Sequence, residues 1–230
     1  MNQFVVSILV LCPNKRCNLF WQSTHGFFVH RHDNDPHWCP PTLNDFQKTV
    51  LDEIKTWAKD FNKRPIFFLK GEHWTGNTDI ALNALQDIHK SGELVVSFFC
   101  TKGSNTGFML PRLANKLALE FPKFRLNLLQ AIEKDPLVAD RVEKDYQMDK
   151  LILDPLRQSG SPKTVIIIDS LQEYQEKGRE ILLCLKNTMS KIQTAGIKFL
   201  ITCDLKKIHE NISLLDSESE SFALEENISS

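Results

Sequence analysis

The sequence predicts an α/β protein in which a mainly parallel sheet of about five strands lies between two layers of helices. Short apolar runs at 66–69, 94–99, 165–168 and 199–202 have the length and the β-branched or aromatic content of buried strands. Segments with apolar residues at three- and four-residue spacing separate these runs. Such alternation is typical of strands that run parallel, so a three-layer fold is expected.

The composition excludes several classes of protein. The 230 residues are 42% hydrophobic and 25% charged, which suits one α/β core and does not resemble a disordered chain. The formal net charge of -1, without a basic stripe, argues against nucleic acid or a membrane surface as the partner. Six cysteines lie scattered in apolar runs, without the spacing of a disulfide framework, so we expect a reducing, cytoplasmic compartment.

Residues 1–41 form a loop-rich leader ahead of the predicted domain, which covers residues 42–230. The apolar start, residues 4–12, lacks a basic flank and a cleavage site and is too short to span a bilayer. We interpret it as a buried strand or a docked tail, with a signal peptide as the alternative. The His and Cys residues between 12 and 39 suggest zinc, but their spacing fits no familiar ligand pattern and favours a plain leader.

A lead helix is predicted over 42–61, with Thr42 as its N-terminal cap because Asp45 follows three residues later. The core then spans 65–225. After the first strand, a helix begins at about Thr78 and ends near a lysine and a glycine that suit a helix C-terminus. The apolar face of the lead helix consists of Leu43, Phe46, Val50, Ile54, Trp57, Ala58 and Phe61.

The second half of the core alternates in the same way. One long amphipathic helix is expected through residues 181–192. A last short strand is expected at 222–224, after a solvated acidic loop at 216–220. Helical segments fill residues 110–158, with boundaries or kinks at Pro111, Pro122, Pro136 and Pro155.

A loop that matches the phosphate-binding pattern of P-loop NTPases follows the first strand. Gly71, Gly76 and Thr78 stand at the required spacing, between a strand and a helix as the pattern demands. In a working loop, backbone N–H groups surround the phosphates, a lysine contacts them and the final hydroxyl binds magnesium. We therefore predict a P-loop NTPase fold, with nucleotide-binding positions Gly71, Gly76, Asn77, Thr78 and Asp79 and with Asn77 in the place of the lysine.

Asp169 ends the most β-branched run of the chain and indicates a Walker B motif. In this motif a carboxylate at the end of a strand holds magnesium and a second acid lies nearby. Thr78 and Asp169 are therefore the predicted magnesium ligands when nucleotide is bound, and Glu173 is the candidate catalytic residue. The alternative is purely structural, with Asp169 capping a turn and with Thr78 and Asp79 capping a helix.

From about Cys39 to Leu224 the chain resembles the NACHT-type STAND P-loop NTPases, in particular the nephrocystin-like form found in fungal NOD-like receptors. Cys39, Thr42 and Trp57 match the family pattern around the lead helix, and residues 71–81 align with Gly-Pro-Ala-Gly-Thr-Gly-Lys-Ser-Thr-Ile-Ala. The resemblance implies a multistrand parallel sheet and a nucleotide-controlled signalling switch. Further matches are Ser97-Phe98-Phe99, Leu113-Ala114, Leu117-Ala118, Gln147, Leu151-Ile152 and Pro155-Leu156.

The departures from the family pattern fall on the chemistry. Asn77 replaces the lysine, Gln172 replaces the second Walker B acid, and Asp204 replaces an arginine in the segment that resembles Thr-Ser-Arg-Pro. Losing one charge-assisted contact to phosphate costs about 1.5–3 kcal/mol. Glu72 adds a negative charge and Trp74 adds bulk in the loop. These changes predict weakened binding of ATP or ADP with Mg²⁺.

Two hypotheses about function follow. In the first, the chain is a degenerate P-loop module that acts as a regulatory or protein-interaction element, hydrolyses little or no NTP, and binds protein partners, a second copy of itself among the candidates. In the second, it is a signalling switch of the NOD-like receptor type that holds ATP or ADP through backbone N–H groups, Thr78 and Asp169. A third hypothesis is a fragment or decaying copy, because the family continues into lid, winged-helix and repeat regions.

Overall fold

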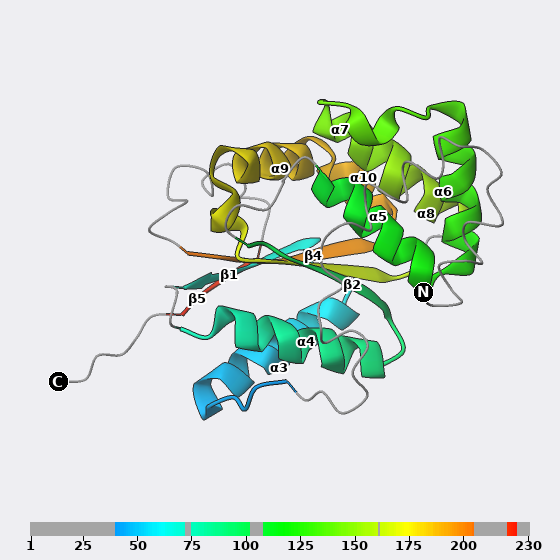
Figure 1. Ribbon diagram of the computed structural model, residues 1–230. Helices are drawn as coiled ribbons and strands as arrows, with labels where there is room; N and C mark the ends of the chain where they lie inside the picture. The colour runs from blue at the N-terminus through cyan, green and yellow to red at the C-terminus, as the bar shows by residue number, and fades with distance from the viewer. Residues whose placement is uncertain (1–39, 72–74, 102–107, 161, 205–219, 225–230) are drawn as a thin grey trace, which may run out of the picture. The chain divides into compact units, whose positions relative to one another are not determined.

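The computed structural model describes residues 40–71, 75–101, 108–160, 162–204 and 220–224 (Figure 1). The chain divides into two compact units. Among the described residues, the helical unit comprises 108–160. The sheet unit comprises 40–71, 75–101, 162–204 and 220–224.

The sheet unit contains five parallel strands in the order β2-β3-β4-β1-β5. This arrangement confirms the predicted α/β fold with a mainly parallel sheet of about five strands. Because all strands point the same way, Gly71, Asp169 and Cys203 end neighbouring strands at one edge of the sheet. The strands are β1 (Ile66–Gly71), β2 (Leu94–Phe99), β3 (Thr164–Asp169), β4 (Ile197–Cys203) and β5 (Glu220–Leu224).

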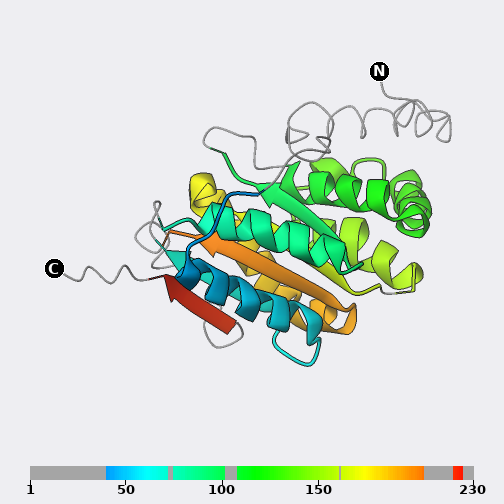
Figure 2. The ribbon, with the colours of Figure 1, turned by 90° about the horizontal axis from the view of Figure 1, so that it is seen from below.

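Helices cover both faces of this sheet. Helices α3 (Asp45–Lys59) and α4 (Asn77–Lys90) lie on one face, and α9 (Gln175–Asn187) and α10 (Met189–Thr194) lie on the other (Figures 1 and 2). Alternate strand residues therefore point into two apolar layers, which is why the strands appear in the sequence as continuous apolar runs. The layer under α3 and α4 includes Val50, Ile54, Trp57, Ile80, Ala84, Phe67, Leu69, Ile167 and Leu200.

Helix α3 begins later than the sequence predicts. Its N-cap is Asn44, whose Oδ1 accepts a hydrogen bond from Gln47 N at 2.8 Å, while Gln47 Oε1 accepts one from Asn44 N at 3.0 Å. This reciprocal capping box satisfies two backbone donors, so it fixes the helix start more strongly than Thr42 could. The predicted cap at Thr42 is therefore wrong. Phe46, expected on the apolar face, is 48% exposed.

Two further expectations for the sheet unit need correction. The single helix predicted through residues 181–192 is broken at Thr188, whose hydroxyl donates to the Cys184 carbonyl at 2.6 Å. A threonine that bonds back in this way distorts the helical ladder. The acidic loop predicted at 216–220 ends one residue early, because Glu220 is the first residue of β5. Residues 216–219 lie outside the described residues.

The helical unit confirms the predicted run of helices, and Pro122 marks a helix start as expected. It stands in the first turn of α6, where its missing N–H costs nothing. Pro155 instead lies within a helical run that continues without a break from residue 144 to residue 158, directly after a π-helical turn. A buried core that includes Leu113, Phe124 and Leu151 holds the unit together. Its elements are α5 (Met109–Glu120), α6 (Pro122–Lys134), the 3-10 turn η2 (Val138–Asp140), α7 (Lys144–Met148), the π-helical turn η3 (Asp149–Leu153) and α8 (Asp154–Gln158).

Candidate functional site

The predicted phosphate loop lies between a strand and a helix. Gly71 is the last residue of β1 and is buried, and Gly76 is the N-cap of α4. Gly76 has a φ of 80°, and a Cβ at this position would collide with the side-chain amide of Gln47. The backbone conformation therefore favours glycine here, whereas the Gln47 amide is the end of a flexible side chain that can move aside. Glu72 and Trp74 lie outside the described residues.

Asn77 uses its side chain within the loop. Its Nδ2 donates to the Gly71 carbonyl at 3.3 Å and so connects the two ends of the loop. Its Oδ1 is buried and has no hydrogen-bond partner in the described part of the chain. A neutral amide at this position therefore supplies no positive charge, and leaving its oxygen unpaired costs about 1–3 kcal/mol.

Thr78 and Asp169 come together across the sheet edge. The Thr78 hydroxyl donates to Asp169 Oδ2 at 2.9 Å, and the Ser170 hydroxyl donates to the same oxygen at 3.0 Å. The Thr202 hydroxyl donates to Asp169 Oδ1 at 2.6 Å. Asp169 is 3% exposed, and its carboxylate accepts hydrogen bonds from hydroxyls on α4, on β4 and in the turn after β3. A carboxylate and a hydroxyl oxygen are ligands that suit Mg²⁺, so this pair fits the ion that the sequence predicts.

Thr202 is a site residue that the sequence motifs did not single out. Besides donating to Asp169, its Oγ1 accepts a hydrogen bond from Ser170 N at 2.8 Å. Ser170 has a φ of 58°, in the left-handed region that a side chain rarely adopts. Thr202 thus holds a strained turn directly behind Asp169. The sequence feature that could have identified Thr202 is its position at the start of the segment that resembles Thr-Ser-Arg-Pro.

Gln172 and Asp204, two departures from the family pattern, meet in one contact. The Gln172 Oε1 accepts a hydrogen bond from Asp204 N at 3.1 Å. The two residues are 8% and 7% exposed, so the contact is buried. The Gln172 carbonyl oxygen is therefore held by the backbone directly after β4.

Glu173, the candidate catalytic residue, is half-buried in the 3-10 turn η4 (Leu171–Tyr174). Its backbone N–H donates to Ser170 O at 3.0 Å. Burial, followed by the charges of Asp169 and Glu173, raises the pKa of the Cys100 thiol above its ordinary value. The charges of Asp169 and Glu173 therefore both influence Cys100, which directly follows β2. The catalytic role of Glu173 stays a prediction.

The lead helix reaches the loop through Gln47, a second residue that the sequence did not single out. Gln47 Nε2 donates to Thr75 O at 3.1 Å, while the rest of its side chain completes the capping box of α3. Asp79 stands in the first turn of α4, and its backbone carbonyl accepts from Asn83 Nδ2 at 2.8 Å. A carboxylate at this position interacts favourably with the helix dipole, and its negative charge repels a bound anion.

A parallel sheet, a loop between β1 and α4 and a carboxylate at the end of β3 define the P-loop NTPase fold. The structure of a Walker-type ATPase of Pyrococcus abyssi is similar over 75% of this chain, with a TM-score of 0.50 and 15% identity. The sequence model of the family described as Nephrocystin 3, N-terminal, matches residues 47–203. Since this is more than half of the chain, the protein belongs to that family.

The structures of two replication proteins match this chain with lower TM-scores. A DNA replication initiation factor has a TM-score of 0.45 with 12% identity, and DnaA from Aquifex aeolicus bound to AMPPCP has a TM-score of 0.45 with 10% identity. Each match covers 83% of this chain and 50% of the other protein, and the Walker-type ATPase is covered to 52%. The chain thus spans about half the length of these three structures. No curated protein matches its sequence.

The described residues contain no group of three or more His, Cys, Asp or Glu side chains that could hold a metal ion. The His and Cys residues of the leader lie outside them. Within the same residues, no helix combines the length and apolar character needed to cross a membrane. The cysteines described in the structure, Cys100, Cys184 and Cys203, are buried thiols that form no disulfide.

Proposed function

We propose that this protein is a degenerate P-loop module that serves as a regulatory or protein-interaction element and hydrolyses little or no NTP. The observation that carries the proposal is Asn77. Its amide stands where the loop needs a positive charge, and it bonds to the Gly71 carbonyl of the same loop. Without an ammonium group at this point, the developing charge on a transferred phosphoryl group has no partner from the loop.

The buried contact between Gln172 and Asp204 supports the proposal. Gln172 cannot serve as a general base, and its carbonyl oxygen is already bonded to Asp204 N. The Asp204 carboxylate takes the place of an arginine that would attract phosphate. Changes at positions 77, 172 and 204 therefore all act against hydrolysis, while the fold remains.

Calorimetric titration of the intact chain with Mg-ATP and with ADP tests the proposal, together with a phosphate-release assay. We expect no binding in the low micromolar range and no phosphate release above that of the Asp169→Asn variant. Asn77→Lys supplies the missing charge, and Asn77→Gln is the matched neutral control. We expect a gain of about ten- to a hundredfold in affinity for the lysine variant alone. Low-micromolar binding by the unmodified chain would overturn the proposal.

The second candidate function is a nucleotide-binding switch of the NACHT or STAND type, and one observation favours it. Thr78 and Asp169 still lie within hydrogen-bond distance, as a magnesium site in this fold requires. If this function is the correct one, ADP or ATP binds more tightly with Mg²⁺ than without it. The Thr78→Ala variant then loses that difference, while Thr49→Ala, on α3, retains it.

A further inference from the structure

In the helical unit, side-chain hydrogen bonds hold the connection between α6 and α7 together with the first turn of α7. We name residues 135–146 the α6–α7 platform. Asp135 Oδ1 accepts a hydrogen bond from Leu137 N at 3.3 Å. Its Oδ2 accepts from Arg141 Nη2 at 3.3 Å and from Tyr146 Oη at 3.1 Å. One carboxylate thus joins the beginning, middle and end of the platform.

A buried glutamine holds the same segment from the interior. Gln147 is fully buried, and its Nε2 donates to Val138 O at 3.2 Å and to Ala139 O at 2.7 Å. Its Oε1 accepts from Lys144 Nζ at 3.1 Å. The side chains of Val138 and Ala139 are buried beside these bonds. The backbone of the platform is therefore ordered before anything binds to it.

This ordered segment presents large apolar side chains to solvent. Leu137 is 63% exposed and Val142 is 82% exposed, although their neighbours Val138 and Ala139 are buried. The ring of Tyr146 is also exposed, and the Arg141 guanidinium lies 5.6 Å from its centre. Tyrosine and arginine are common in the centres of protein interfaces. A surface fixed in advance loses little conformational entropy on binding.

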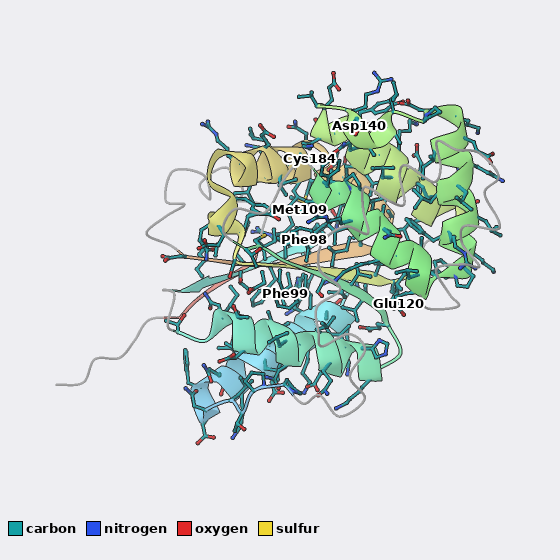
Figure 3. The ribbon with its side chains drawn as sticks, viewed as in Figure 1. Phe98, Phe99, Met109, Glu120, Asp140 and Cys184 are labelled. Carbon is teal, nitrogen blue, oxygen red and sulfur yellow. The ribbon has the colours of Figure 1, made fainter. Side chains whose placement is uncertain are left out.

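The charges around Val142 indicate the chemistry of the partner. The two cations of the platform have partners, since Arg141 pairs with Asp135 and Lys144 Nζ donates to Gln147 Oε1. Asp140 and Glu143 are exposed carboxylates that flank Arg141 and Val142 in the chain. Asp140 lies at the periphery of the helical unit, near α7 (Figure 3). A partner that covers Val142 must therefore meet negative charge beside the apolar contact, and basic side chains complement it.

We propose that the α6–α7 platform is a docking surface for a protein segment that presents an apolar side chain next to lysine or arginine. This develops the interaction role in the proposed function, but it rests on residues of the helical unit alone. Its occupant is a basic, amphipathic segment of another protein.

Titration of the intact chain with a synthetic helical peptide of leucine and lysine, about 18 residues long, tests the proposal. The matched control peptide has glutamate in place of lysine. Binding is located by NMR from the methyl signals of Leu137 and Val142. The variants are Leu137→Ser and Val142→Ser, with Leu126→Ser as the control because Leu126 is 58% exposed on α6, outside the platform.

We expect the lysine peptide alone to shift the two methyl signals, and we expect either platform variant to weaken binding about tenfold while Leu126→Ser does not. The affinity should fall as salt is raised, because exposed charges are screened. Equal binding of both peptides, shifts confined to other methyl groups, or self-association abolished by Val142→Ser would each overturn the proposal. None of these results depends on nucleotide. The docking proposal and the proposed lack of NTP hydrolysis can therefore fail independently of each other.

Discussion

The hydroxyl of Thr78 on α4 donates a hydrogen bond to Asp169 Oδ2 at the end of β3, over a distance of 2.9 Å. In the absence of magnesium this bond is a structural link between the loop helix and the sheet. The Asp169 carboxylate has a second and more buried hydroxyl donor in Thr202, which is 1% exposed. The two threonines therefore make different contributions to stability.

We expect Thr78→Val to lower the free energy of unfolding by about 1 kcal/mol, since it removes one partly exposed hydrogen bond. Thr202→Val should cost about 2–3 kcal/mol, because both Asp169 Oδ1 and the backbone N–H of Ser170 lose a partner in a buried place. Urea unfolding of the two variants measures the difference. Equal losses would contradict this assignment.

Ser170 provides a test of backbone strain. Its φ of 58° is unfavourable for any residue with a Cβ, and most unfavourable for a β-branched one. Ser170→Gly should leave the stability nearly unchanged, since relief of strain offsets the lost bond to Asp169. Ser170→Val should lower it by about 2 kcal/mol or more. Thermal unfolding shows this, with Ser190→Val, on the exposed side of α10, as a control that changes little.

Lys198 is a buried cation that holds the end of the lead helix. Its Nζ donates to Trp57 O at 2.6 Å and to Asp60 O at 2.8 Å and lies 4.5 Å from the Trp57 ring centre. We expect Lys198→Met, which keeps the apolar stem, to cost about 3 kcal/mol. Hydrogen exchange should speed up in the last turn of α3. Lys48→Met, at a largely exposed lysine, should cost less than about 0.5 kcal/mol.

Cys100 makes the stability depend on alkaline pH. Burial, with the charges of Asp169 and Glu173, raises its pKa above the ordinary 9.0. The unfolded chain therefore loses this proton first as the pH rises. The stabilisation that comes from the neutral buried thiol is fully present below about pH 9. Above that pH, the free energy of unfolding falls by up to about 1.4 kcal/mol per pH unit. Unfolding free energies between about pH 8 and 10.5 should fall less steeply for Cys100→Ala than for the unmodified chain; parallel curves would contradict the prediction.

The sheet and the loop were predictable because each strand is short, apolar and followed by a residue with a conformational or chemical signature. Gly71 and Asp169 are such residues, and both end strands as expected. The start of α3 was not predictable in this way, since Thr42 and Asn44 are both residues that cap helices well. Only the reciprocal bonds between Asn44 and Gln47 decide between them.

The contacts of the site could not be read from the sequence because they depend on strand register and on the packing of α3. Thr202 lies 33 positions from Asp169, and Gln47 lies 28 positions from Thr75. Neither spacing belongs to a local pattern. In the same way, Gln172 looked like the loss of an acid until the structure showed its bond to Asp204 N.

Helix α3 is fastened at both ends, by Gln47 to the carbonyl of Thr75 and by Lys198 to its last carbonyls. The smallest piece of this unit that can fold by itself therefore starts ahead of Asn44. A shortened chain that begins at Arg64 would expose Phe67, which packs on Trp57, and would remove the carbonyls that accept hydrogen bonds from Lys198. The lead helix is thus an integral part of the P-loop fold.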